Sequence, residues 1–178
     1  MALVLLLPCV ACSSTATETT QSGASENAAA STASQASESA QDFDRAELIK
    51  MAIENQKYSY APYSGFNVSA AVLMDSGEVY LGANVENSAY PAGVCAEHNA
   101  INAAVLHGER NIVAIAIVGG KDYKISDYCA PCGICRQVMR EFSDPPQMKV
   151  IIAISPTEYK EMTLEDLLPI SFGPSHLE

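Results

Sequence analysis

Residues 112–118 read IVAIAIV, an unbroken apolar run that ends at Gly119 and Gly120. An apolar run of this length bounded by turn signals is typical of a strand that is buried on both faces. Residues 150–154, VIIAI, form a second run of this kind. Segments with helical spacing precede and follow the two runs. This alternation of helices and buried strands predicts an α/β protein, a three-layer α/β/α sandwich with a mixed sheet.

The neighbouring segments extend this prediction. Helical spacing or helix-start signals predict helices at residues 42–56, 96–107 and 134–142, and a short one from Thr163. Residues 66–74 and 79–85 are β-type runs, and the turn sequence 75–78 between them indicates a hairpin. Asp42 or Asp44 is expected to cap the first helix.

The first 41 residues are expected to lie outside the fold. Residues 2–7 are the short apolar run ALVLLL, and Ala11-Cys12 matches the point where a bacterial lipoprotein signal ends at a lipidated cysteine. Residues 13–41 hold almost only small and polar residues, which cannot bury enough surface to offset the entropy of ordering. We therefore divide the chain into a signal-like segment (1–12), a disordered linker (13–41) and one globular domain (42–178).

This N-terminal pattern favours an extracytoplasmic lipoprotein held at a membrane by a lipid on Cys12. Two features favour the alternative of a cytoplasmic protein with a disordered extension. No Lys or Arg precedes Arg45, so the basic region of a signal peptide is missing, and position 9 is Cys where the lipoprotein pattern usually has Leu.

Charge and hydropathy exclude two classes of function. The chain of 178 residues has 21 acidic and 10 basic side chains, which gives a formal net charge of −11. Because nucleic-acid binding needs clustered Lys and Arg, a nucleic-acid polymer is excluded as a partner. No apolar run reaches the roughly 18–20 residues that cross a bilayer as a helix, which excludes an integral transporter or channel.

Three cysteines of the globular part predict a metal site. Cys132 and Cys135 are three residues apart at the start of a predicted helix, and Cys95 begins another. Three thiolates leave the fourth position of a tetrahedral zinc ion open, which is typical of a catalytic site. Helix N-termini also favour the thiolate form. Cys132 and Cys135 alone would equally suit a structural zinc knuckle or a redox pair, and Cys129 is expected to be an ordinary thiol near the site entrance.

Glu97 lies two residues after Cys95, so the two side chains can share a site only at a helix end, with Cys95 at the cap. A carboxylate beside a metal-activated water can take its proton and pass it to a leaving group. Without the cysteines, Glu97 would be an ordinary carboxylate in the first turn of a helix.

Five motifs in order resemble those of the small zinc-dependent cytidine deaminases, over residues from about 46 to 177. The motifs are Y-x-P-Y-S-G-F, N-V-E-N-x-A-Y, C-A-E, P-C-G-x-C-R-Q-V and L-L-P-x-S-F-G-P. The resemblance implies the cytidine deaminase fold, a homotetramer with one Zn²⁺ per subunit, and a role in pyrimidine salvage. It also implies hydrolysis of cytidine and 2′-deoxycytidine to uridine and 2′-deoxyuridine, with release of ammonia.

The resemblance also implies a role for each matching residue. Cys95, Cys132 and Cys135 would be the zinc ligands, and Glu97 would protonate N3 of the pyrimidine and help ammonia leave. The other matches are Asn84 and Glu86 as the ribose-binding pair, Phe66 as the aromatic against the base, Ala96 as a backbone contact to the pyrimidine, and Phe172 as an aromatic that enters a neighbouring subunit's site. Each of these assignments also has a purely structural alternative. Asn84 and Glu86 would then form a solvated edge-strand pair, and Phe66 and Phe172 would fill core space without a role in substrate binding.

His98 departs from the family pattern, which usually has Arg after the catalytic Glu. Arg offsets the negative charge of three thiolates permanently, whereas His does so only when protonated or through a weaker N–H bond to sulfur. We therefore hypothesise that His98 tunes the charge of the site and makes activity depend on pH near neutrality. Two other functions remain open: a blasticidin-S-type deaminase, against which the segment N-V-E-N argues, and a catalytically impaired zinc protein that binds nucleosides.

Overall fold

The computed structural model describes residues 42–177, so the signal-like segment and the linker expected at residues 1–41 lie outside the described residues. Five strands form one mixed sheet in the order β2-β1-β3-β4-β5. The strands are β1 (Phe66–Met74), β2 (Val79–Ala83), β3 (Ile112–Lys121), β4 (Lys149–Ser155) and β5 (Glu158–Thr163). Among the described strands, β3 and β4 pair in parallel and the other neighbours pair antiparallel. The predicted hairpin, buried strands and mixed sheet are confirmed.

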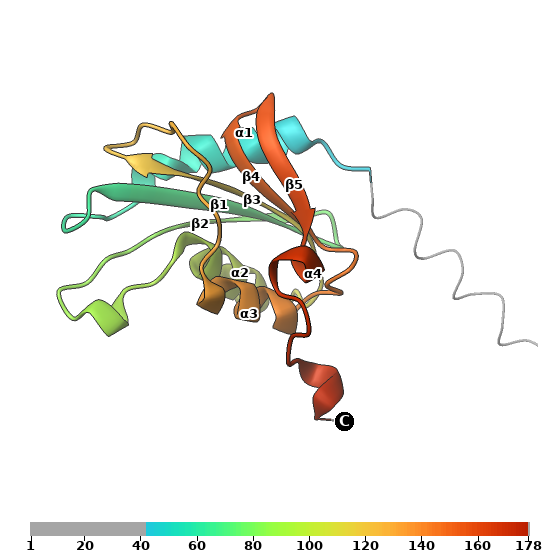
Figure 1. The fold of residues 1–178 in the computed structure, drawn as a ribbon. Helices are drawn as coiled ribbons and strands as arrows, with labels where there is room; N and C mark the ends of the chain where they lie inside the picture. Colours follow the sequence, from blue (N-terminus) through green and yellow to red (C-terminus); the bar gives the residue numbers. More distant parts are fainter. Residues whose placement is uncertain (1–41, 178) are drawn as a thin grey trace, which may run out of the picture. The chain divides into compact units, whose positions relative to one another are not determined.

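Helix α1 (Arg45–Asn55) covers one face of this sheet (Figure 1). The Asp44 carboxylate caps it by accepting a hydrogen bond of 3.0 Å from the backbone N–H of Glu47. Its buried residues Leu48, Ile49 and Ala52 pack on small and β-branched side chains of β1, β3 and β4. Small side chains dominate this side of the core, because alanines occupy much of the sheet surface that faces α1.

Helices α2 (Ala96–Leu106) and α3 (Gly133–Glu141) cover the opposite face, so the molecule has the three predicted layers (Figure 1). The larger side chains of the core, such as Ile101, Ile115 and Met139, gather on this side. The N-termini of both helices carry the three cysteines that the sequence predicts as metal ligands. Within the described range, no helix has the length and apolar character needed to cross a membrane.

A short helix, α4 (Leu164–Leu167), follows β5, as the helix-start signal at Thr163 predicted. Thr163 and Asp166 form a reciprocal capping box, in which each side chain accepts a hydrogen bond from the other residue's backbone N–H. Three single turns of 3-10 helix complete the described elements: η1 (Gln56–Tyr58), η2 (Tyr90–Ala92) and η3 (Pro174–His176).

The structure differs from the sequence-based expectation in three places. Strand β5 was not predicted, because it is a charged edge strand in which four of six residues are exposed. Strand β2 ends at Ala83, two residues early, and Val85 continues it only as isolated bridges. Ile134, whose spacing from Val138 and Phe142 indicates the helix at residues 134–142, is 70% exposed, and Cys135 and Met139 are the buried residues of α3 instead.

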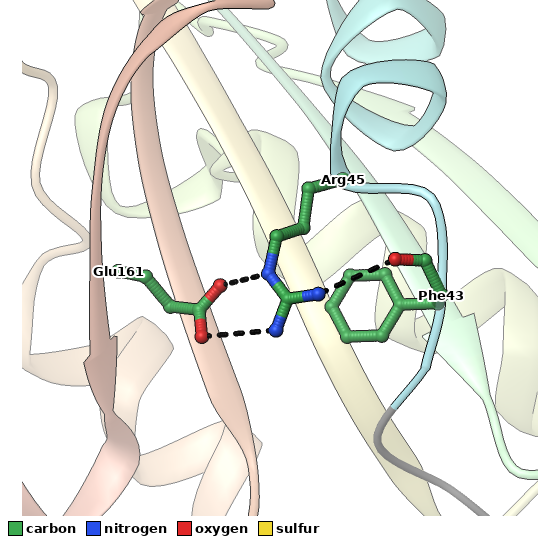
Figure 2. Close-up of polar contacts among 3 residues, drawn as sticks. All are labelled: Phe43, Arg45 and Glu161. Atoms are coloured by element: carbon green, nitrogen blue, oxygen red, sulfur yellow. Dashed lines mark hydrogen bonds and ion pairs between the residues drawn. The ribbon is translucent and has the colours of Figure 1, made fainter.

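An ion pair links the start of α1 to the edge strand β5 (Figure 2). The Arg45 guanidinium donates through Nε and Nη2 to the two carboxylate oxygens of Glu161, and Nη1 donates to the carbonyl of Phe43. The guanidinium also lies 4.6 Å from the centre of the Phe43 ring. The hydrogen bond to Glu161 raises the pKa of Arg45. This paired geometry joins the first helix to a strand that comes 116 residues later.

Candidate active site

Cys95 and Cys132 hold the same position on two neighbouring helices. Each is the N-cap residue, of α2 and α3 respectively, with extended rather than helical backbone angles. The sulfur atom of Cys132 also accepts a hydrogen bond of 3.4 Å from the backbone N–H of Cys135, one turn into α3. The two helix starts therefore bring three sulfur atoms together, as the spacing predicted.

The three sulfur atoms have the spacing that a single tetrahedral metal ion needs. The Sγ atoms of Cys95 and Cys132 are 3.9 Å apart, and those of Cys132 and Cys135 are 3.5 Å apart. Zn–S bonds of about 2.3 Å in a tetrahedron place their sulfur atoms roughly 3.8 Å apart. All three atoms lie within 4.8 Å of one another, so the donor set fits zinc by number, chemistry and distance.

The pKa values of the Cys95 and Cys135 thiols are shifted in opposite directions. Hydrogen bonding from Cys135 lowers the pKa of Cys95 to about 7, against the opposing effects of burial and the nearby Glu97 charge. Hydrogen bonding to Cys95 and burial raise the pKa of Cys135. Cys95 therefore becomes a thiolate, the form that binds a metal, more readily than Cys135.

Glu97 is a buried carboxyl group beside these sulfur atoms, with 4% of its surface exposed. Burial raises its pKa, and interactions with its own backbone N–H, the Cys135 thiol and the His98 charge partly oppose that rise. A carboxyl group with a raised pKa holds a proton more readily than an exposed one, which suits a role in proton transfer. Glu97 is the second residue of α2, and Cys95 is the N-cap residue just outside the helix, as predicted. This non-helical position lets the two side chains lie close together.

A pocket of about 440 Å³ opens next to Cys95. Asn84 and Glu86 line it, although both lie beyond the end of β2 rather than within the strand. Its complete lining consists of Tyr63, Ser64, Asn84, Val85, Glu86, Asn87, Tyr90, Gly93, Val94 and Cys95. The structure therefore brings a candidate metal-binding thiol and two candidate sugar-binding side chains, all predicted from the sequence, into the lining of one cavity.

The side chains of Glu86 and Asn84 are both held by the protein. The Glu86 carboxylate accepts hydrogen bonds from the backbone N–H groups of Tyr63 (2.9 Å) and Ser64 (3.2 Å). The Ser64 hydroxyl and these N–H groups lower the pKa of Glu86, which keeps it ionised. Asn84 bonds to Ser59, Phe66 and Val68. The alternative of a freely solvated edge-strand pair is therefore wrong.

The remaining candidates are not in the lining of this pocket. Phe66 begins β1 and is 42% exposed, so it does not fill core space. Ala96 is fully buried at the start of α2. Phe172 stacks on His176 of its own chain, with ring centres 5.0 Å apart, and is not in the pocket lining. His98 is half-buried.

Cys129 has a packing role that the sequence did not indicate. A Cβ atom on Gly119 would lie only 2.7 Å from the Cys129 sulfur, so the thiol fills the space that this glycine leaves open on β3. Burial raises the pKa of Cys129 to about 11. It therefore stays a thiol where Cys95 ionises.

Five residues of the pocket were quoted in motifs but given no role from the sequence: Tyr63, Ser64, Val85, Asn87 and Tyr90. Tyr63 and Tyr90 meet edge to face, with ring centres 6.4 Å apart. The motif spacing places Tyr63 and Ser64 near Phe66, but only the pairing of Tyr60 with Val85 brings that loop against Glu86.

Three sulfur ligands leave one position of a zinc ion for a reacting water molecule, and a buried carboxyl group lies beside them. The class of protein that this fold and centre define is a zinc-dependent hydrolase. Comparison with known families agrees. Residues 43–153 match the model of the cytidine and deoxycytidylate deaminase zinc-binding region. The chain belongs to the cytidine deaminase family.

Individual relatives show how much of the chain this similarity covers. Cytidine deaminase from Halalkalibacterium halodurans is 43% identical over 129 residues, which are 72% of this chain and 94% of that protein. Cytidine deaminase from Sporosarcina psychrophila is 38% identical over 134 residues, 75% of this chain and 95% of that protein. The crystal structure of cytidine deaminase from Burkholderia pseudomallei matches with a TM-score of 0.64 and 38% identity, covering 71% of this chain and 97% of that one.

Proposed function

We propose that this enzyme hydrolyses cytidine and 2′-deoxycytidine to uridine and 2′-deoxyuridine with release of ammonia, as a step of pyrimidine salvage. The observation that carries the proposal is the pocket itself. One cavity is lined by Cys95 of the three-sulfur cluster and by the polar side chains Asn84 and Glu86. A neutral nucleoside fits this acidic protein better than a nucleotide, whose phosphate it would repel.

Cys95, Cys132 and Cys135 would hold one Zn²⁺ per subunit. When bound, zinc supplies an activated water molecule for attack on the ring carbon that carries the amino group. Glu97 would accept one proton from that water and deliver it to N3 of the pyrimidine. It would then move the second proton of the same water, from the oxygen added to the ring, to the amino group as the C–N bond breaks. One water is consumed and one ammonia is released. Burial supports this role, because a carboxyl group with a raised pKa holds the proton between the two transfers.

The sugar and the base would be held by the other candidates. Asn84 and Glu86 bind the ribose hydroxyl groups, Phe66 packs against the base, and the backbone at Ala96 contacts the pyrimidine. Phe172 enters the site of a neighbouring subunit in a homotetramer. Its support is an aromatic ring that is 58% exposed on the described chain. Light scattering of the purified protein tests the tetramer, and a monomer with full activity would exclude this role for Phe172.

Glu97→Gln tests the function directly. The amide keeps the shape of the side chain but cannot carry the proton, so kcat for cytidine falls by roughly 10²-fold to 10⁴-fold while zinc content stays at one per subunit. Glu54→Gln, an exposed carboxylate on α1, is the matched control and keeps full activity. Uridine formation at full rate by Glu97→Gln, or wild-type protein without stoichiometric zinc, would overturn the proposal.

The proposal includes a location. The ALVLLL run followed by Ala11-Cys12 supports an extracytoplasmic lipoprotein anchored through Cys12, with a cytoplasmic protein as the alternative. These residues lie outside the described part of the chain. Mass spectrometry of the mature protein distinguishes the two, because an N-terminal diacylated Cys12 indicates the lipoprotein and an unprocessed, unmodified N-terminus indicates the alternative.

A further inference from the structure

Three buried polar side chains lie behind Asn84, and none of them is in the pocket lining. Gln56, Ser59 and Asn67 are 4%, 7% and 4% exposed. Burying polar groups of this kind costs free energy unless every one is hydrogen-bonded, and within the described residues no buried side-chain nitrogen or oxygen lacks a partner. The three side chains therefore form a satisfied network that ends at a residue of the pocket.

The hydrogen bonds of this network run in one direction. Asn67 Oδ1 accepts from the backbone N–H of Tyr123 (3.3 Å), so the amide nitrogen of Asn67 faces the other way and donates to Ser59 Oγ (3.0 Å). Gln56 Nε2 donates to the carbonyl of Asn67 (3.0 Å) and holds that residue in place. Because the amide oxygen Asn84 Oδ1 can only accept, the Ser59 hydroxyl directs its own hydrogen to it.

Asn84 is left with a single free hydrogen-bonding group. Its Oδ1 accepts from Ser59 and from the backbone N–H of Val68 (2.8 Å), which uses both lone pairs. Its Nδ2 donates one hydrogen to the carbonyl of Phe66 (2.9 Å), so one N–H remains. Asn84 can therefore only donate to a ligand, whereas the neighbouring ionised Glu86 can only accept.

We propose that Ser59, held by Asn67, is a positioning residue that makes Asn84 a pure hydrogen-bond donor and so sets the preference of the pocket for a sugar hydroxyl. A hydroxyl oxygen accepts from Asn84 while a hydroxyl hydrogen is donated to Glu86. Without Ser59, one lone pair of Asn84 Oδ1 becomes free and the carboxamide loses the donor that holds it. This inference rests on the proposed role of Asn84 at the sugar.

Ser59→Ala tests the inference with the product uridine and one of its analogues as competitive inhibitors. The inhibition constant of uridine rises about 5-fold to 10-fold, the equivalent of one hydrogen bond, whereas that of 2′,3′-dideoxyuridine, which lacks the 2′- and 3′-hydroxyls, stays unchanged. The kcat for cytidine stays within about 2-fold because the reacting groups are untouched. Asn67→Ala gives a smaller change in the same direction, since it frees the Ser59 hydroxyl to turn.

Ser69→Ala is the matched control. Ser69 is fully buried in the same strand as Asn67, and its hydroxyl bonds to Asn55 and to the carbonyl of Gly82 without contacting Asn84. It lowers stability but leaves the preference for uridine over 2′,3′-dideoxyuridine unchanged. Equal weakening of both inhibitors in Ser59→Ala would show a merely structural role and overturn the inference.

Asn84→Ala distinguishes failure of the positioning role of Ser59 from failure of the sugar-binding role of Asn84. If Asn84→Ala removes the preference for uridine and Ser59→Ala keeps it, the positioning role of Ser59 is wrong and the sugar-binding role of Asn84 stands. If Asn84→Ala leaves the preference intact, the assignment of Asn84 to the sugar is wrong, and the inference fails with it.

Discussion

Gly82 of β2 and Ala96 at the start of α2 are in close backbone contact. A Cβ atom on Gly82 would lie 2.3 Å from the carbonyl oxygen of Ala96 and 2.4 Å from the backbone nitrogen of Ala100. Both neighbours are main-chain atoms and cannot turn aside. The missing side chain at Gly82 therefore sets how closely α2, which carries Cys95 and Glu97, approaches the sheet.

Gly82→Ala is expected to destabilise the protein by about 3 kcal/mol or more, because α2 has to move away from β2. The same movement displaces Cys95, so the variant binds less than one zinc per subunit. Thermal unfolding and metal analysis measure the two effects. Gly133→Ala is the control for stability, since a Cβ atom there meets no atom within 4 Å. A Gly82→Ala protein with unchanged stability and zinc content would contradict this account.

Arg45→Met tests the ion pair between α1 and β5 shown in Figure 2. The paired side chains are 30% and 26% exposed, so their interaction is only partly screened by water. We expect a loss of about 1 kcal/mol in the free energy of unfolding, which becomes smaller at high salt. The kcat for cytidine does not change, because Arg45 belongs to α1, which covers the face of the sheet opposite to α2 and α3.

Lys50→Met is the control for that measurement. Lys50 and Glu47 also form an ion pair on α1, but at 3.6 Å and with more than half of each side chain exposed. Its removal changes stability by less than about 0.5 kcal/mol. Equal effects of the two substitutions, or an Arg45→Met effect that salt leaves unaltered, would exclude a special contribution from the paired geometry.

The sequence was informative about the fold where hydrophobic pattern and burial coincide. The run at 112–118 predicted β3 because both faces of that strand are covered. Strand β5 has no such pattern, since it lies at an edge and its partner β4, rather than its own side chains, determines its conformation. Ile134 is exposed although its spacing indicated the helix, because Cys135, not an aliphatic residue, faces the core at the start of α3.

For the candidate site, the sequence predicted the three cysteines and the carboxyl group that the structure brings together, but not the side chains that hold Asn84. Cysteine spacing and Glu97 were sufficient to predict the three-sulfur cluster beside a carboxyl group. Ser59 and Asn67 gave no signal, because isolated Ser and Asn are common in loops and strands. Their connection to Asn84 arises only when η1, β1 and the segment after β2 pack together.

Ser64→Ala tests the charge of Glu86. The Ser64 hydroxyl is the largest influence lowering the pKa of Glu86, so its removal brings that pKa back toward the ordinary value for Glu. As pH falls, Glu86 is protonated and can no longer accept from a sugar hydroxyl. The rise of KM for cytidine at acid pH therefore begins at a higher pH in Ser64→Ala than in the wild type.

Measurements of KM from about pH 4 to pH 7 show this shift. Ser88→Ala, an exposed serine of the loop after Glu86, is the control and follows the wild-type curve. An identical acid limb in Ser64→Ala would mean that the hydroxyl does not stabilise the Glu86 carboxylate during substrate binding.

His98→Arg tests the departure from the family pattern. The positive charge of His98 lowers the pKa of Glu97. By our hypothesis, this charge would also offset part of the negative charge of three thiolates around one Zn²⁺. Imidazole loses this charge as pH rises through neutrality, whereas guanidinium keeps it. The ratio of kcat in His98→Arg to kcat in the wild type is therefore expected to rise between about pH 6 and pH 8. His107→Arg, at the exposed C-terminal end of the same helix, keeps a constant ratio. A constant ratio for His98→Arg as well would show that His98 does not tune the charge of the site.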